Sequence, residues 1–224
     1  MAMAFVRPDN TDTGFELVAL QSLEGGVNVY VHTNGRWIGG YRPAWYRAHP
    51  FRLIRDEQND RDAVCVDEAS PAFQKEASEQ ALRLFDDDGE PTQRTHDTIS
   101  FLDKLQQATR VTHAQIAQLE KAGVIVPWPL TTRKPDSEEG RQVKGLYHID
   151  EAALRALDPE VLAQLARSGA LSMAYTQLLS EHRLKGLTRL YDLRNKANQQ
   201  AKPSSDLDLE DLFSDDNDDL SFNF

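Results

Sequence analysis

Apolar and polar residues alternate along the first third of the chain, which is typical of half-buried β-strands. In residues 27–33, VNVYVHT, three valines share one face, and Asn34 with Gly35 then provides a two-residue hairpin signal. This third is therefore predicted to form antiparallel strands. Further strands are predicted at residues 15–20, 51–56, 62–68 and 81–86.

From residue 92 onward, the apolar residues recur with the longer period of helices. Thr92 is expected to cap a first helix that ends near Ala108. Thr112 and Gln115 fit a capping box for a second helix, and Gly123 fits its C-terminal glycine. The rest of the pattern predicts extended segments at 124–130 and 143–150, helices at 151–157, 159–168 and 171–198, N-caps at Asp150 and Asp158, and an interruption of the last helix at Gly186.

Strands followed by helices predict an α+β fold, with an N-terminal antiparallel β-sheet and then a helical half packed against it. An acidic C-terminal tail is expected to be disordered. The predicted organisation is an N-terminal extension (1–14), a single domain (15–200) that is β-rich over 15–90 and mainly helical over 91–200, and a linker with the acidic tail (201–224).

The charge is unevenly spread. The net charge is −11, yet residues 206–224 hold eight acids and no base, which leaves 28 acids against 25 bases in the rest of the chain. The single cysteine, Cys65, excludes a disulfide within the chain and suits a reducing compartment. Neither a signal-peptide pattern nor an 18-residue apolar run is present. We therefore expect a cytoplasmic protein without membrane insertion.

Residues 35–56, GRWIGGYRPAWYRAHPFRLIRD, interleave five arginines with five aromatic residues. Nucleic-acid surfaces use such residues for phosphates and bases, but the negative charge of this chain makes nucleic acid an unfavoured partner. One interpretation is architectural, with solvated arginines beside an apolar strand face. The other is a surface for a ligand or peptide, with Arg42, Trp45, Tyr46 and Arg47 as candidate binding residues.

Trp128 stands between Pro127 and Pro129. A large aromatic residue held by two prolines loses little conformational entropy when it is fixed. We therefore expect Trp128 to be a buried anchor between the helical half and the sheet. An exposed Trp128 would instead be a candidate binding residue.

His148, Asp150 and His182 are the residue types of a two-histidine, one-carboxylate iron site. Helices follow Asp150 directly, however, and a helix N-cap explains this aspartate. Phosphate-binding glycine loops and the G-x-S-x-G pattern do not occur in the sequence. Cys65, flanked by valines, is interpreted as a small buried hydrophobic residue. We predict no metal site and no cofactor, and we assign no catalytic residue.

Leucines and phenylalanines are spaced among the acids of residues 206–224. This alternation is typical of segments that bind a basic groove with apolar pockets, and the phenylalanine end resembles the partner-recruiting tails of bacterial single-stranded-DNA-binding proteins. The tail could bind a partner, or it could contact the basic stretch from Arg183 to Lys202; residues 181–202 hold six bases and two acids. Its candidate binding residues are Leu212, Phe213, Phe222 and Phe224.

Six segments in the same order resemble the SapC family of bacterial proteins across about residues 15–190. The resemblance implies a link to the transport of surface-layer proteins, and it carries no catalytic residue. An unrelated membrane permease shares the family's name. The segments are GRWIGGYRPAWYRAHPFRLIRD, DAVCVDEASP, LFDDDGEPT, GVIVPWPL, GLYHIDEAALRAL and RSGALSMAYTQLLSEHRLKGL.

Three functions are compatible with these observations. The leading hypothesis is a non-enzymatic cytoplasmic protein that binds a protein or peptide and assists the export or handling of a surface protein. The first alternative is a peptide-modifying enzyme, or the obligatory subunit of one. The second alternative is a recruitment factor that acts through its acidic, phenylalanine-ended tail.

Overall fold

The computed structural model describes residues 1–8, 14–56, 58–76, 81–133 and 140–200. It has antiparallel sheets in the N-terminal part and helices in the later part, which confirms the predicted α+β class. The main sheet has the order β2-β1-β8-β5, with all neighbours antiparallel. Its strands are β1 (Met3–Val6), β2 (Glu16–Ala19), β5 (Ile125–Pro127) and β8 (Leu146–Ile149).

The main sheet is covered on both faces. Alternate residues of β1 point to opposite sides, so Phe5 belongs to one buried cluster and Ala4 to another. The first cluster takes in the C-terminal end of α2 (Gln93–Lys121) with α3 (Glu151–Arg155), α4 (Pro159–Ser168) and α5 (Ala170–Ser180). The second cluster takes in Trp128 and α6 (Leu184–Gln200).

Residues 3–6 lie at the centre of this sheet, between β2 and β8. The N-terminal extension expected for 1–14 is corrected accordingly, since this part of it is a core strand. All four residues of β1 are apolar, because a central strand is buried on both faces, and the alternation that marks the other strands is therefore missing.

α2 is a single helix of 29 residues, about 43 Å long at 1.5 Å per residue. Thr92 caps it as predicted, and the predicted boundary between two helices near residue 108 is wrong. Gln115, expected in a capping box with Thr112, donates instead from Nε2 to the carbonyl oxygen of Ser168 at 3.0 Å. That hydrogen bond ties the C-terminal third of α2 to the end of α4.

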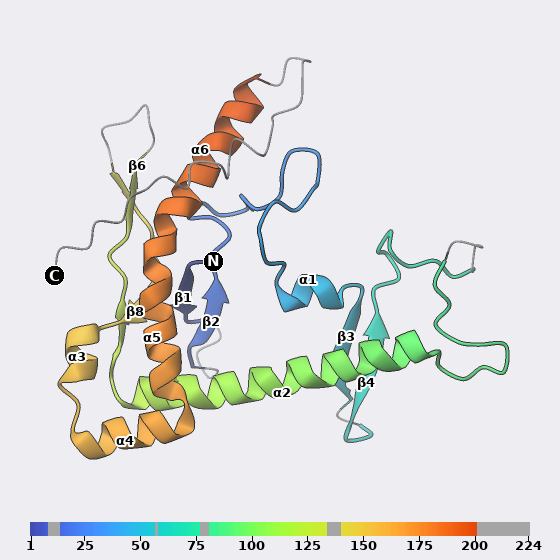
Figure 1. The fold of residues 1–224 in the computed structure, drawn as a ribbon, viewed down its shortest axis with the longest axis horizontal. Coiled ribbons are helices and arrows are strands. Elements are labelled where there is room, and N and C mark those ends of the chain that lie inside the picture. The colour runs from blue at the N-terminus through green and yellow to red at the C-terminus, as the bar shows by residue number, and fades with distance from the viewer. Residues whose placement is uncertain (9–13, 57, 77–80, 134–139, 201–224) are drawn as a thin grey trace.

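The first two-thirds of α2 leave the sheet and carry a second, smaller unit (Figure 1). This unit consists of α1 (Ala44–Ala48) and the hairpin of β3 (Phe51–Asp56) with β4 (Arg61–Val66), both packed against α2. We call residues 41–111 the arm and the rest of the described chain the body. The predicted strands at 51–56 and around Cys65 are confirmed as this hairpin.

Two other predicted strands are wrong. Residues 27–33 contribute only an isolated bridge between Val31 and Trp37, although the turn between them is present. Val29 packs into the second buried cluster instead of joining a ladder. Residues 81–86 likewise form only the bridge between Phe85 and Pro91. Phe85 is exposed and is not part of a buried strand face.

The last helices follow the sequence closely, except at one division. Asp150 caps α3, with Oδ1 accepting from the Ala153 amide at 3.0 Å. α4 ends at Gly169, which has a φ of 81°. The final division falls at the 3-10 turn η1 (Glu181–Arg183) instead of Gly186, which is inside α6. A short hairpin, β6 (Thr131–Arg133) and β7 (Gly140–Gln142), lies beside α6.

The described helices include none with the length and apolarity of a membrane span.

Candidate protein-interaction surface

α1 presents aromatic side chains to solvent. The helix has five residues, and Ala48 is the buried one. Trp45 is 60% exposed, and Tyr41, just before the helix, is also 60% exposed. Tyr46 is 43% exposed. A short helix can bury only a narrow stripe, so its remaining side chains form a surface.

Neighbouring elements hold this surface in place. The Tyr46 hydroxyl donates to Oε1 of Gln21 at 2.8 Å, which links α1 to the segment after β2. The Arg47 guanidinium lies over the rings of Tyr41, at 5.4 Å, and Phe101 of α2, at 5.2 Å. Such cation–π contacts orient Arg47 without neutralising its charge.

A row of aromatic rings extends from α1 toward the body. Tyr46 lies 5.5 Å from Trp37, and Trp37 stacks on Tyr30 at 5.6 Å. Gly39 passes close to these rings, since a Cβ there would lie 3.0 Å from both the Trp37 indole nitrogen and Tyr30. A larger residue at this position would therefore have to displace the rings of Trp37 and Tyr30.

The surface around α1 is positively charged. Arg36, Arg42, Arg47 and Arg52 are exposed, and within the described ranges none of them forms an ion pair. Arg55 differs, because it pairs with acids in and beside β4. Unpaired arginines beside exposed aromatic residues are the side chains that protein interfaces favour.

Further exposed apolar side chains lie on the arm beyond α1. They come from both strands of the hairpin, from the segment before α2 and from α2 itself. Among the described residues, ten large hydrophobic residues are exposed, and eight of them belong to the arm. Those outside α1 and its approach are Ile54, Val64, Leu82, Phe85 and Val111.

His49 and Ser70 are residue types that can act as a general base and a nucleophile, and they lie at hydrogen-bond distance. Nε2 of His49 is 2.8 Å from Oγ of Ser70. The same Ser70 hydroxyl accepts from the Ala72 amide at 3.2 Å, and the residue is buried. These contacts fix the turn after β4 against the end of α1. The pair is explained by its role in the fold.

The structure brings four predicted binding residues together at α1, namely Arg42, Trp45, Tyr46 and Arg47. Trp128 lies elsewhere and is 7% exposed, so the prediction that it is buried is confirmed. Its ring stacks on His148 with the centroids 5.2 Å apart. The remaining candidates lie outside the described residues: Leu212, Phe213, Phe222 and Phe224.

The residues of the hypothetical iron site each have another role or position. Nδ1 of His148 lies 3.0 Å from Oε1 of Glu181, and Asp150 caps α3. His182 is in the turn η1 and is exposed. In the part of the chain that the structure describes, no cluster of three or more histidines, cysteines and acids is placed to hold a metal ion.

The exposed hairpin residues could not be recognised from the sequence. Alternation in residues 51–56 predicts a strand with one buried face. It does not predict that the apolar side chain of Ile54 is exposed on the other face. The arginine and aromatic composition was the one available signal, and it marks α1 only.

Comparison with known proteins gives one match. No curated protein and no solved structure matches the chain. The family model of SapC matches residues 1–187, which include the whole arm, the main sheet and α3 to α5. Over more than four-fifths of its length, therefore, the chain belongs to the SapC family.

Proposed function

We propose that this chain is a cytoplasmic, non-enzymatic binding protein that holds a protein or peptide partner on its arm and assists the export or handling of a surface protein. One observation carries the proposal: eight of the ten exposed large hydrophobic residues in the described chain lie on the arm. Large apolar side chains are costly to expose to water, and a part of a protein that gathers them is a candidate interaction site.

The chemistry of α1 suits an acidic partner segment with apolar side chains. Trp45 and Tyr41 offer apolar area, and Arg42 and Arg47 offer unpaired positive charge. Tryptophan, tyrosine and arginine are the residues most enriched at binding hot spots. An acidic peptide offers both carboxylates for the arginines and apolar side chains for Tyr41 and Trp45, so we favour a protein partner over nucleic acid.

The experiment uses a photo-crosslinking amino acid in living cells. Placed at Trp45, it should give a discrete adduct with an exported or surface protein, identified by mass spectrometry. Placed at Leu179, an exposed apolar position on α5 of the body, it should not. Arg42→Glu combined with Arg47→Glu should suppress the adduct. Equal adducts from both positions, or no adduct from Trp45, would contradict the proposal.

For the enzyme alternative, the contact between His49 and Ser70 is the arrangement to test. A serine-reactive fluorophosphonate probe, applied to the full chain, distinguishes the two functions. The binding proposal expects no labelling of Ser70 and expects Ser70→Ala to retain the Trp45 adduct. Labelling that Ser70→Ala abolishes would favour the enzyme.

A further inference from the structure

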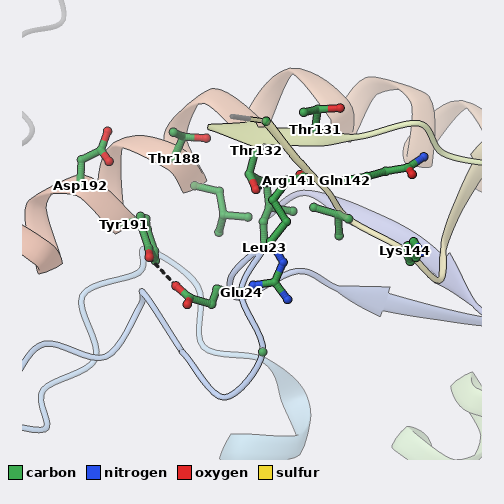
Figure 2. Close-up of a pocket in the computed structure, with 14 residues that line it drawn as sticks. Leu23, Glu24, Thr131, Thr132, Arg141, Gln142, Lys144, Thr188, Tyr191 and Asp192 are labelled. Atoms are coloured by element: carbon green, nitrogen blue, oxygen red, sulfur yellow. Dashed lines mark hydrogen bonds between the residues drawn. The ribbon is translucent and has the colours of Figure 1, made fainter. Parts of the chain in front are cut away.

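A groove of about 1090 Å³ lies between α6, the β6–β7 hairpin and the turn at residues 23–25 (Figure 2). Thr132 and Arg141 come from the two strands of the hairpin, and Thr188 and Tyr191 face them from α6. The groove is on the body and is separate from the arm. Its volume is just above the range of about 300–1000 Å³ that is typical of small-ligand sites, which suits a short peptide segment.

The lining of the groove combines apolar and hydrogen-bonding side chains. Leu23, Val143 and Leu187 contribute the apolar part. One carboxylate of the lining already has a partner, because the Tyr191 hydroxyl donates to Glu24, as the dashed line in Figure 2 shows. The groove can therefore receive apolar side chains while its polar groups contact a backbone or charged groups.

Exposed bases line and border the groove. Arg141 and Lys144 line it from the hairpin side. On α6 the spacing of Lys185, Arg189 and Lys196 places them on one stripe with Asp192, which also lines the groove. Within the described chain none of these five bases forms an ion pair. Five bases against Glu24 and Asp192 leave an excess of positive charge.

We propose that this groove binds an acidic peptide that carries leucine and phenylalanine side chains, and that residues 206–224 of the same chain occupy it. The segment has eight acids and no base, with seven leucines and phenylalanines among them. Its charge complements the bases around the groove, and its apolar side chains complement Leu23 and Val143.

The connection is short enough for the segment to bind in the same molecule. From Gln200, the end of α6, back to Thr188 is about 18 Å along the helix axis. The six residues from Gln200 to Asp206 span at most about 20 Å when extended. A linker of this length gives an effective concentration on the order of millimolar, so weak attraction suffices.

The test is paramagnetic NMR on the full chain. A nitroxide label is attached at Ser221→Cys in a Cys65→Ser background, and amide resonances are compared with the label oxidised and reduced. The proposal expects selective intensity loss at groove residues such as Thr132, Arg141 and Thr188. Because exposed charges are screened within about 3 Å at 1 M salt, the loss should diminish there.

Charge reversal provides the matched comparison. Arg141→Glu combined with Lys144→Glu should restore most of the lost intensity, because the lining then repels the acids. Lys104→Glu combined with Arg167→Glu changes the net charge equally at exposed positions on α2 and α4, and should leave the intensity loss unchanged. Thermal melts of all variants verify that each is folded.

Three outcomes would overturn the inference. The first is an absence of intensity loss at low salt. The second is loss centred elsewhere, for example on α1. The third is found by mixing two kinds of chain, one that carries the isotope without the nitroxide and one that carries the nitroxide without the isotope. Intensity loss at the groove in this mixture would mean that the occupant is the tail of a second copy. The first and third results leave the arm proposal unaffected, whereas loss centred on α1 would mean that the tail competes for the arm.

Discussion

The body and the arm treat their apolar residues in opposite ways. Of the eighteen buried hydrophobic residues in the described chain, sixteen lie in the body, whereas Ala48 and Leu102 are those of the arm. Eight of the ten exposed large hydrophobic residues are on the arm. The body therefore provides the stability of the fold, and the arm leaves large apolar side chains exposed.

This difference has consequences for dynamics. The arm depends on a two-stranded hairpin and one side of α2, and an isolated two-stranded hairpin is only marginally stable in water. Regions with little buried apolar area open at lower free energy than the core. We expect the arm to open while the body remains folded, and binding of a partner to stabilise it.

The largest expected effect compares two tryptophans. Trp128 packs in the second buried cluster with Leu187, and Trp128→Ala should lower the free energy of unfolding by about 3–5 kcal/mol. Trp45 is exposed on the arm, and Trp45→Ala should change it by at most about 0.5 kcal/mol. Urea unfolding measures both. A similar loss for the two variants would show that the arm shares the stability of the body.

The sequence predicted local structure well where a few neighbouring residues determine a strand or a helix cap. The strand at 146–149 and the cap at Asp150 are examples, because a short apolar and aromatic stretch after Gly145 and an aspartate before a helix act over a few residues. The continuity of α2 was not predictable in this way. Gln115 satisfies a capping box locally, but its partner is 53 residues away at Ser168.

The candidate surface was predicted only in part, for a similar reason. Arginine and aromatic composition marked α1, whose short helix exposes them. That Ile54 and Val64 are also exposed depends on the absence of a further layer over the hairpin in the described structure, which is a property of the tertiary arrangement. The groove is likewise formed by elements more than 100 residues apart, from Leu23 to Tyr191.

The next effect concerns a buried polar contact in the body. Gln177 is fully buried, accepts from the Ile149 amide at 2.9 Å and donates to the Met3 carbonyl at 3.2 Å. Gln177→Leu leaves both backbone groups unpaired and should cost about 1–3 kcal/mol. Gln93→Leu removes an exposed contact to Asp97 on the arm and should cost at most about 0.5 kcal/mol.

Calorimetric or urea unfolding of the two glutamine variants checks this expectation. Equal stabilities would mean that water replaces Gln177 in its contacts, and that the join between α5 and the sheet is looser than described.

A smaller effect compares two helix caps. The Thr92 hydroxyl accepts from the Thr95 amide at the arm end of α2, and Asp150 caps α3 in the body. Either substitution by alanine should cost about 0.5–2 kcal/mol at its own helix. Hydrogen exchange should show Thr92→Ala accelerating the arm alone, whereas Asp150→Ala should accelerate α3 and its neighbours in the body. Acceleration of both regions by Thr92→Ala would mean that the arm and the body unfold together.

The smallest effect is a difference in the pH range over which one contact of the body and one contact of the arm are lost. In the body, the hydrogen bond to Glu24 raises the pKa of Tyr191, so this contact stabilises the fold below the ordinary tyrosine pKa of about 10 and is lost as the pH rises through the raised value. In the arm, the hydrogen bond from the Asn59 side chain lowers the pKa of Asp56. That contribution is present above the ordinary aspartate pKa of about 4 and is lost as the pH falls through the lowered value.

Alkali should therefore loosen the contact between α6 and the turn at 23–25, and acid should loosen the hairpin turn. Titrations by NMR, with Glu24→Gln and Asn59→Ala as matched variants, should move the pKa of Tyr191 and of Asp56 respectively toward their ordinary values. If Glu24→Gln leaves the titration of Tyr191 unchanged, the body lacks this contact and the alkaline half of the comparison is wrong.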